Sequence, residues 1–362
     1  MPPISRRRIG DLLLEVHELD LQYSLLPLQV SAYAREIKPE LAAGAFQPAR
    51  SRLLWLPLHA AVIAGAGAAI SAGWVPWPFA LALSLVIGAS FAGLTFLGHE
   101  ALHGAVVRGR LLRRVVGWLG FLPFVVSPRL WIAWHNRVHH GHANHAGADP
   151  DAYPTLREYE RHLSLRIADH VSPGRRRWTG LFSLIVGFSV QSLHMLLRAR
   201  KLGLLSRAEH RLAIAETLLG VACWAAVAVC AGPQSFVLIF VLPLLVANAI
   251  VMAFILTNHS LSPLCDVNDP LINTLSVTVP GWVEFLTLRF GFHVEHHIFP
   301  AMSSRHAPAV RAVLLARWPE RYQSMPLVSA LRALHRTARV YKNETTLVDP
   351  SSGQEWKLPQ TG

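Results

Sequence analysis

Four long apolar stretches dominate the pattern of hydrophobic and polar positions along the chain. They cover residues 53–72, 75–97, 212–230 and 236–257. Each has close to the roughly 20 apolar residues that an α-helix needs to cross a bilayer. Glycine and proline, which favour turns, interrupt the pattern at residues 73–78 and 231–234. The pattern therefore predicts four transmembrane helices arranged as two hairpins.

The charged residues predict an orientation for these hairpins. The chain is 52% hydrophobic and 15% charged, and all 34 of its lysines and arginines lie outside residues 53–97 and 212–257. Cytoplasmic segments of membrane proteins carry the excess of basic residues, so we expect both termini and the segment between the hairpins to be cytosolic. The net charge of +12 follows this topology rather than one basic motif. It therefore indicates attraction to anionic lipid and no nucleic-acid partner.

Two shorter apolar stretches, at residues 115–126 and 181–197, complete the pattern. The first is too short to span a bilayer. The second, if it crossed alone, would put the histidine groups before and after it on opposite faces of the membrane. Both are therefore predicted to be interfacial or buried helices on the cytosolic side. The polar tail from Thr345 contains proline and glycine and is expected to be flexible.

Together these features predict an all-α integral membrane protein with four transmembrane helices in two hairpins and a cytosolic helical cap. The predicted parts are a cytosolic N-terminal region (1–52), the first hairpin (53–97), a cytosolic segment (98–211), the second hairpin (212–258), a second cytosolic segment (259–344) and a flexible tail (345–362).

Candidate chemistry lies in the 19 histidines, which cluster at the predicted membrane ends. The clusters are His99 with His103, then His135 with His139 and His140, and finally His293 with His296 and His297. Residues three or four apart share a helix face, so each cluster can direct histidines toward one point. His140 is rotated by about 100° from its neighbour and would need a second metal or a bend at Gly141. His259, at the end of the fourth span, is a ninth candidate.

Eight or nine imidazoles are too many for one ion but suit two ions with four or five ligands each. The predicted topology brings all four groups to one face of the bilayer, which supports a shared dimetal site. Imidazole binds iron, copper, zinc and nickel. A site at the membrane surface implies a lipid or other apolar substrate, and breaking an inert C–H bond requires a redox metal and oxygen. Zinc has no redox chemistry, so iron is favoured.

Other classes of protein use part of this pattern. His99-Glu-x-x-His103 also occurs on zinc-peptidase helices, with Glu100 as general base, but a peptidase would leave the other clusters without a role. A transporter or a metal-binding membrane protein without catalysis is a third class. Transporters place polar groups near the bilayer midplane, whereas these histidines lie at the span ends. His142 and His145 are expected to be loop residues or neighbours of the ligands.

The motifs also resemble those of the membrane fatty acid desaturase family. The similar segments, within residues 81–315, are Gly98-His-Glu-Ala-Leu-His-Gly104, Asp149-Pro-Asp-Ala-Tyr-Pro154, Asp269-Pro-Leu-Ile-Asn-Thr-Leu275 and Phe292-His-Val-Glu-His-His-Ile-Phe-Pro-Ala-Met302. The resemblance implies a non-haem di-iron enzyme that uses O2 and two electrons to insert a double bond into an acyl chain. The implied iron ligands are His99, His103, His135, His139, His140, His259, His293, His296 and His297.

The resemblance leaves two features of the reaction open. A hydroxylase or ketolase of an alkane, sterol or carotenoid in the same superfamily would use the same iron site. The chain contains no His-Pro-Gly-Gly haem signature of a fused cytochrome domain, so electrons are expected from a separate ferredoxin or cytochrome b5. Side chains near the clusters that could orient the imidazoles are Glu100, Asp149, Asp151, Asn258 and Glu295.

Overall fold

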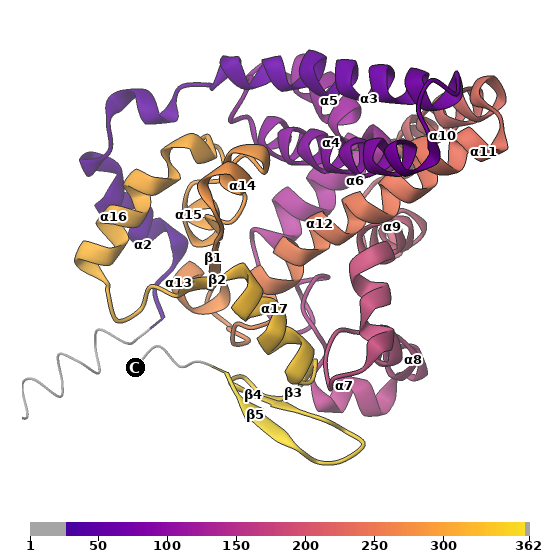
Figure 1. The fold of residues 1–362 in the computed structure, drawn as a ribbon. Coiled ribbons are helices and arrows are strands. Elements are labelled where there is room, and N and C mark those ends of the chain that lie inside the picture. Colours follow the sequence, from indigo (N-terminus) through magenta and orange to yellow (C-terminus); the bar gives the residue numbers. More distant parts are fainter. Residues whose placement is uncertain (1–26, 359–362) are drawn as a thin grey trace, which may run out of the picture.

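The structure, a computed structural model, describes residues 27–358 and is mainly helical (Figure 1). Within that range, five helical segments are long and apolar enough to cross a membrane. They are Arg50–Ser71, Trp77–His103, Trp178–Arg198, Arg207–Ala231 and Pro233–His259. The pair Arg110–Phe124 and Pro128–His139 bends by 101° and would count as a sixth only if it formed one broken span. All four stretches predicted as transmembrane helices are helical.

The fold consists of long apolar helices and of short helices that connect them or follow them. The first part contains α2 (Val30–Ile37), η1 (Lys38–Glu40), η2 (Ala43–Phe46), η3 (Arg50–Leu54), α3 (Trp55–Ser71) and α4 (Trp77–His103). The central part contains α5 (Arg110–Phe121), η4 (Leu122–Phe124), α6 (Pro128–Trp131), the π-helix η5 (Ile132–His139), α7 (Leu156–Arg161), α8 (Leu163–Val171), η6 (Trp178–Gly180) and α9 (Leu181–Arg198).

The rest of the chain contains the second predicted hairpin and the elements that follow it. The hairpin is α10 (Arg207–Ala231), α11 (Pro233–Phe236), the π-helix η7 (Val237–Val241) and α12 (Leu242–His259). The later helices are α13 (Pro270–Asn273), α14 (Gly281–Leu286), α15 (His293–Ile298), η8 (Ser304–His306), α16 (Ala307–Arg317) and α17 (Leu327–Arg336). Figure 1 shows α14 and α15 between the α2–α16 pair at the left and the long helices at the right.

The C-terminal half of α4 is the centre of the fold. Its side chains are buried from Phe91 to Leu102, and the helix packs against α3, α5 and α12. The crossing with α5 is very close, because a Cβ atom on Gly120 would lie only 2.6 Å from the Cα atom of Gly98. Only glycine permits two helix backbones to approach in this way. The contact therefore sets the position of His99, the next residue on α4.

A smaller core holds α15 against α2 and α16. At its centre is the fully buried Asp269, which accepts hydrogen bonds from the backbone N–H of Leu28 at 2.7 Å and the Tyr33 hydroxyl at 3.0 Å. The guanidinium of Arg321 contacts the same carboxylate at 2.5 Å. Hydrogen bonds to a buried charge are stronger than neutral ones, so this network ties the N-terminal part to the segment before α15.

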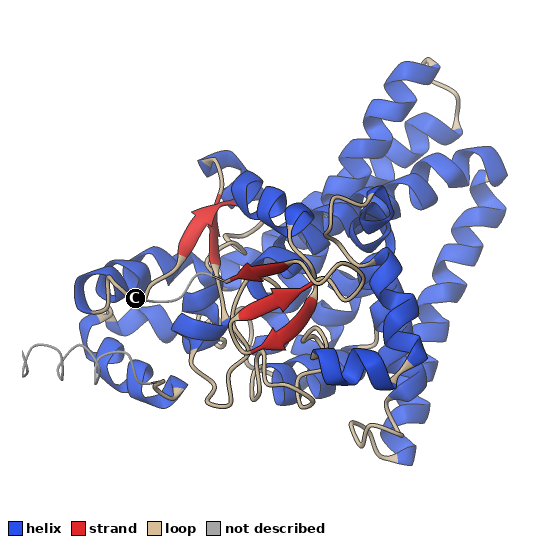
Figure 2. Ribbon diagram, turned by 90° about the horizontal axis from the view of Figure 1, so that it is seen from below, coloured by secondary structure: helices blue, strands red, loops and turns tan. Residues whose placement is uncertain are grey.

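The structure also contains five short strands, so the prediction of an all-α fold is correct only in its main part. β1 (Ser276–Thr278) pairs in parallel with β2 (Ser324–Pro326). β3 (Val340–Asn343), β4 (Thr346–Val348) and β5 (Glu355–Lys357) form an antiparallel sheet. Figure 2 shows these strands away from the long helices, which project to the upper right.

The prediction of a flexible tail from Thr345 is therefore wrong for residues 345–358. Leu347 is fully buried and packs with Tyr341, Leu264 and Leu358. The turn between β4 and β5 is closed by Asp349, whose backbone N–H donates to the Gln354 carbonyl at 2.8 Å. Each strand contributes only a few apolar side chains. The polar composition of this region therefore gave no sign of a sheet in the sequence. Residues 1–26 of the predicted N-terminal region lie outside the described part of the chain, as do residues 359–362 of the tail.

The α4–α5 crossing leads to a prediction about stability. Replacing Gly120 by Ala should push the two backbones apart and destabilise the protein by about 1–3 kcal/mol, despite the higher helix propensity of alanine. Thermal unfolding of the purified protein in detergent would measure this loss. Gly65→Ala is the matched control, because a Cβ atom there meets nothing within 4 Å in the middle of α3. Equal unfolding temperatures for the two variants would contradict the close-contact argument.

Candidate metal centre

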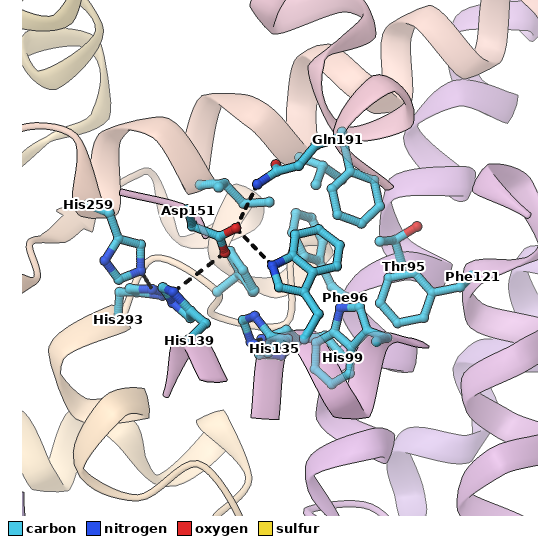
Figure 3. A pocket seen from close by; sticks show the side chains of 16 residues that line it. Thr95, Phe96, His99, Phe121, His135, His139, Asp151, Gln191, His259 and His293 are labelled. Carbon is cyan, nitrogen blue, oxygen red and sulfur yellow. Dashed lines mark hydrogen bonds and ion pairs between the residues drawn. The ribbon is translucent and has the colours of Figure 1, made fainter. Parts of the chain in front are cut away.

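Nine imidazoles from four separate parts of the chain meet below the long helices. His99 and His103 end α4, His135 and His139 lie on η5 with His140 directly after it, His259 ends α12, and His293, His296 and His297 lie on α15. Figure 3 shows five of them, His99, His135, His139, His259 and His293, along one side of a pocket. The structure thus brings together every histidine that the sequence analysis singled out.

The nine histidines form two groups of facing ring nitrogens. The first contains His99, His103, His135 and His296, and the second contains His139, His259, His293 and His297. In each group the potential ligand atoms lie within 4.8 Å of one another. His140 joins the first group, since its Nε2 atom lies 3.2 Å from His135 Nε2 and 3.1 Å from His296 Nε2. The arrangement is therefore five histidines beside four.

The second cluster differs from the α-helical prediction. His135 and His139 are four residues apart, yet they belong to different groups. The reason is that η5 is a π-helix, in which the backbone N–H of His140 donates to the His135 carbonyl at 3.0 Å. Bonding from i to i+5 brings His135 and His140 to one side and directs His139 to the other. His140 was expected to need a different metal from its neighbour or a bend at Gly141. In the structure His139 and His140 lie in different groups, so each faces a different potential metal position.

The third cluster divides in a similar way on the α-helix α15. His293 and His297 are one turn apart, and their Nε2 atoms lie 3.2 Å from each other. His296, between them in sequence, reaches the first group instead. The prediction that all three converge on one point is therefore wrong. One short helix supplies imidazoles to both groups.

The number of facing nitrogens, more than their distances, favours metal ions over hydrogen bonds. Nε2–Nε2 separations run from 2.7 Å, for His259 and His293, to 3.2 Å. A neutral imidazole carries a single N–H, so His140 Nε2 cannot be properly hydrogen-bonded to two facing Nε2 atoms at once. For metal–nitrogen bonds of about 2.1 Å, neighbouring ligand nitrogens are separated by about 3.0–3.4 Å. The groups can therefore each hold a metal ion.

Burial keeps most of these imidazoles in the form that binds a metal. His139 is the exception: burial alone would lower its pKa, but the carboxylates of Asp149 and Asp151 raise that pKa to about 9. Burial lowers the pKa of His293 and His297 well below the ordinary value, and the neighbouring imidazoles lower it further. The same effect of burial, together with His139, lowers the pKa of His296 to about 3. A histidine must be neutral to donate its lone pair to a metal. The site is therefore prepared for ligation at neutral pH.

Two carboxylates orient the imidazole of His139. Asp149 contacts His139 Nδ1 at 3.1 Å through both of its oxygens and also accepts the backbone N–H of Asn144 and Asp151. Burial alone would raise the pKa of the Asp149 carboxyl, but His139 holds that pKa below its usual value. An acceptor at Nδ1 leaves Nε2 of His139 free to face the second group, as metal-binding histidines require.

Asp151 connects this carboxylate pair to the pocket. Its Oδ1 atom accepts hydrogen bonds from Gln191 Nε2 at 2.6 Å and from Trp134 Nε1 at 2.8 Å, and its Oδ2 atom lies 3.4 Å from His139 Nδ1 (Figure 3). Gln191 lies within the apolar stretch of residues 181–197, which the sequence analysis did not connect with the site. A polar side chain inside an apolar helix was a possible sign of a role in the site. The sequence did not indicate its partner, because Asp151 lies 40 residues away.

The other acidic residues named beside the clusters anchor helices rather than imidazoles. Glu295 is fully buried and accepts hydrogen bonds from Ser276, Tyr322 and Arg311, which fix α15 in place. Glu100 accepts hydrogen bonds from Ser303 and Ser304. The amide of Asn258 is buried and has no hydrogen-bond partner among the described residues. His142 and His145 lie outside both groups.

The pocket in Figure 3 is apolar on the side away from the histidines. It has an empty volume of about 550 Å³. Its apolar lining consists of Phe96, Phe121, Trp131, Trp134, Phe188, Val251, Ile255 and Phe290. His99, His135, His139, His259 and His293 line the opposite side. A narrow apolar ligand in this pocket would lie directly against both groups of imidazoles.

Comparison with known proteins identifies the family. The family model described as "Fatty acid desaturase" matches residues 72–328, which is more than two thirds of the chain. The chain belongs to the fatty acid desaturase family. The match includes both groups of histidines and four of the five long apolar helices in full.

Relatives of this desaturase-family chain carry names of acyl-lipid enzymes. The chain is 22% identical over 306 residues to an "Omega-6 fatty acid desaturase, chloroplastic" of Spinacia oleracea, which covers 80% of this chain and 66% of the relative. It is 24% identical over 257 residues to an "sn-1 oleoyl-lipid 12-desaturase" of a Synechocystis strain, with 68% and 71% covered. A shorter match, 29% identical over 123 residues and 33% of each chain, is to an "sn-1 acyl-lipid omega-3 desaturase (ferredoxin)" of the same strain.

These relatives are longer than the region they share with this chain. The chain spans between 54% and 66% of the chloroplast proteins from Arabidopsis thaliana and Spinacia oleracea. The family match at residues 72–328 contains all nine histidines.

The contact between Asp149 and His139 predicts an effect on metal binding. Asp149→Asn keeps the size of the side chain but removes its charge, so His139 Nδ1 faces a weaker, uncharged acceptor. We expect metal affinity to fall by about 10–100-fold, measured as metal retained during dialysis against a chelator. Asp266→Asn is the control, because that side chain is 87% exposed in a nearby loop. Equal metal retention by both variants would count against an orienting role for Asp149.

The lowered histidine pKa values predict the pH dependence of the metal-free protein. Below about pH 6.5 the unfolded chain binds protons on its histidines, whereas the buried His296 stays neutral down to about pH 3. The unfolded state therefore binds more protons, and stability must fall as the pH falls through this window. Each such histidine contributes about 1.4 kcal/mol per pH unit. A thermal unfolding midpoint of chelated protein that stays constant from pH 7.5 to 5.5 would contradict this.

Proposed function

We propose that the chain is an O2-dependent fatty acyl desaturase that inserts a double bond into an acyl chain. The observation that carries the proposal is the apolar pocket lying against two groups of facing imidazoles. Membership of the desaturase family and the names of the relatives support it. A membrane lipid or an acyl thioester would supply the chain.

The proposed ligands divide five to four between two iron ions. His99, His103, His135, His140 and His296 would hold one ion, and His139, His259, His293 and His297 the other. Bound there, the irons would supply the oxidising power for C–H cleavage, using O2 and two electrons. The divided clusters on η5 and α15 support two adjacent ions, because neighbouring residues contribute to different groups.

The protein's own residues would position the acyl chain and exclude water. Phe96, Phe290 and Trp131 form apolar walls directly beside the histidines. Trp134 and Gln191 direct their N–H groups to Asp151, so their polar atoms are satisfied and the pocket stays apolar toward a ligand. Burying methylene groups in such a pocket is favourable by roughly 0.8 kcal/mol each. This binding would hold unreactive C–H bonds at a fixed distance from the metal site.

The proposed topology keeps four crossings in two hairpins, with both termini and the metal centre in the cytosol. Because His140 and His259 lie in one site, the chain between them must cross the membrane an even number of times. α10 and the α11–α12 segment account for two crossings, so α9 is proposed to lie in the interface. The absence of lysine and arginine from residues 53–97 and 212–257 supports the cytosolic side.

Electrons are proposed to come from a separate small redox protein of the ferredoxin or cytochrome b5 type. One relative carries ferredoxin in its name. The two electrons complete the balance of the reaction: O2, two electrons, two protons and two hydrogens from the acyl chain give two molecules of water. A hydroxylase or ketolase of the same superfamily would leave oxygen in the product instead.

The ligand assignment predicts the behaviour of single variants. Changing His103, His139 or His297 to Ala should abolish desaturation and reduce bound iron, because each removes a donor to one ion. Expression in a host followed by mass spectrometry of its acyl chains measures the product, and elemental analysis of the purified protein measures iron. A loss of two hydrogens indicates desaturation, and a gain of one oxygen indicates hydroxylation.

A matched histidine controls for general damage to the protein. His194 lies on α9 outside both groups, so His194→Ala should keep activity and two irons per chain. Wild-type iron and turnover in any of the three ligand variants would refute the assignment. Active protein that contains zinc and no iron would refute the proposed chemistry.

A further inference from the structure

A second, more polar cavity opens beside the first group of histidines. It has an empty volume of about 310 Å³ and is lined by Glu100, Thr287, Arg289, Met302 and Ser304 together with His99 and His296. It shares Phe96, His99 and Phe290 with the apolar pocket. The two cavities therefore adjoin at the rings of Phe96 and Phe290, whose centroids lie 4.7 Å apart. A passage between them would lead from apolar side chains to charged ones.

Three arginines gather at the charged end of this passage. Arg289 donates to the Arg305 carbonyl at 2.6 Å, and Arg305 donates to His306 at 2.9 Å. Arg52 lies behind them, 3.7 Å from Glu100. The pKa of His306 is lowered by its partial burial and by Arg305, Arg289 and Arg52, as expected when three guanidinium groups surround one imidazole. The segments that carry these arginines are far apart in the sequence.

The acidic groups at this end do not neutralise all three arginines. Glu100 is buried below the mouth and is engaged by Ser303 and Ser304. Glu284 lies 4.0 Å from Arg289. Among the described residues, no carboxylate contacts the exposed side chain of Arg305, which donates to His306. The outer part of the mouth therefore retains positive charge and unused N–H donors.

Exposed apolar side chains surround the same mouth. Trp282 and Phe285 on α14 are 69% and 65% exposed, and Leu54 at the start of the first apolar helix is 70% exposed. Phe285 touches Trp55, with ring centroids 5.2 Å apart, so α14 lies beside the start of α3. Tryptophan and apolar side chains next to arginine are typical of the membrane–water boundary. A docking surface for a soluble acidic protein would instead be bordered by polar groups.

Unusual backbone geometry holds Arg289 at this position. Leu288 and Arg289 both have left-handed conformations, with φ values of 53° and 62°. Such values are uncommon for residues other than glycine and are costly unless the surroundings enforce them. The backbone N–H of Arg289 donates to the Glu284 carbonyl at 2.7 Å, and Ser304 Oγ donates to the Leu288 carbonyl. The turn thereby places Leu288 in the core and Arg289 at the mouth.

We propose that Arg289 and Arg305, with Arg52 behind them, bind the phosphate of a membrane phospholipid. Guanidinium groups are the preferred protein partners of phosphate, and basic pockets beside membrane helices bind lipid headgroups. This assignment rests on the proposed function, because it identifies the lipid whose acyl chain would extend past Phe290 into the apolar pocket. The phosphate of a soluble thioester carrier would present the same chemistry. The exposed Trp282 and Phe285 favour the lipid.

The proposal is tested by lipid binding without turnover. The full metal-loaded protein in detergent is mixed with dioleoyl phosphatidylglycerol, or with a galactosyl diacylglycerol of the same chains, and retained lipid is counted by native mass spectrometry. We expect preferential retention of the phospholipid. Arg305→Gln and Arg289→Gln should each weaken it by about 10-fold or more, since each removes charge-assisted hydrogen bonds. Arg289→Lys should restore part of the binding.

Arg207→Gln is the matched control. Arg207 begins α10, another long apolar helix, and its side chain is exposed, so the change removes the same charge at an equivalent membrane end. An equal loss of phospholipid in this variant would overturn the proposal, since it would indicate unspecific attraction. Equal retention of the galactolipid by the wild type would also overturn it.

A third probe distinguishes the two sources of phosphate. An oleoyl phosphopantetheine thioester that binds more tightly than the phospholipid, and loses binding in Arg305→Gln, would overturn the assignment to a lipid. Failure of the proposed function is a separate result, because it would appear as absent desaturation while phosphate-dependent lipid binding persists. Unfolding temperature and iron content check that each variant is folded. Arg305 is exposed, so its variant provides a test even if Arg289→Gln fails to fold.

Discussion

The structure depends on holding nine imidazoles face to face and largely away from solvent. Such a cluster is unfavourable in isolation, because lone pairs converge and each ring loses hydrogen bonds to solvent. Metal binding can compensate for this, but the chain must first bring the rings together. The ends of α4 and α12 contribute three of them from the long helices, and α15 and η5, with the residue that follows η5, contribute the other six. Buried carboxylates and hydroxyls hold η5 and α15 in place.

The supporting contacts are distributed on the far sides of the ligand-bearing elements. Ser276 Oγ accepts the first two backbone N–H groups of α15, and Glu295 in turn accepts the Ser276 hydroxyl. Asp149 performs a similar task for the end of η5 by contacting His139 and the backbone of the following loop. Charged groups are thus kept at the outer faces of α15 and η5. The inner faces present only imidazole and apolar side chains to a ligand.

Much of this arrangement could be predicted from the sequence, because it depends on local patterns. The four apolar helices were evident from hydropathy, and the nine histidines that meet were evident from their spacing at membrane ends. Their division into two groups was not evident, since it depends on the hydrogen bonding of η5 and on the position of α15 between the two groups. The contact of Gln191 with Asp151 joins α9 to a turn 40 residues earlier in the chain. The sheet after residue 340 was missed because its short strands show little alternation of apolar and polar residues.

The π-helix also bears on how such histidine motifs vary in length. On α15, the pattern His293-x-x-His296-His297 places its first and last members together through an ordinary α-helical turn. On η5, the pattern His135-x-x-x-His139-His140 is one residue longer, and the wider turn again places the first and last members together. A π-turn is the usual result of inserting one residue into an α-helix. One extra residue in an α-helix would otherwise rotate a ligand away from its metal. The wider π-helical turn accommodates this residue, so the length of a histidine motif alone does not determine which metal each histidine would bind.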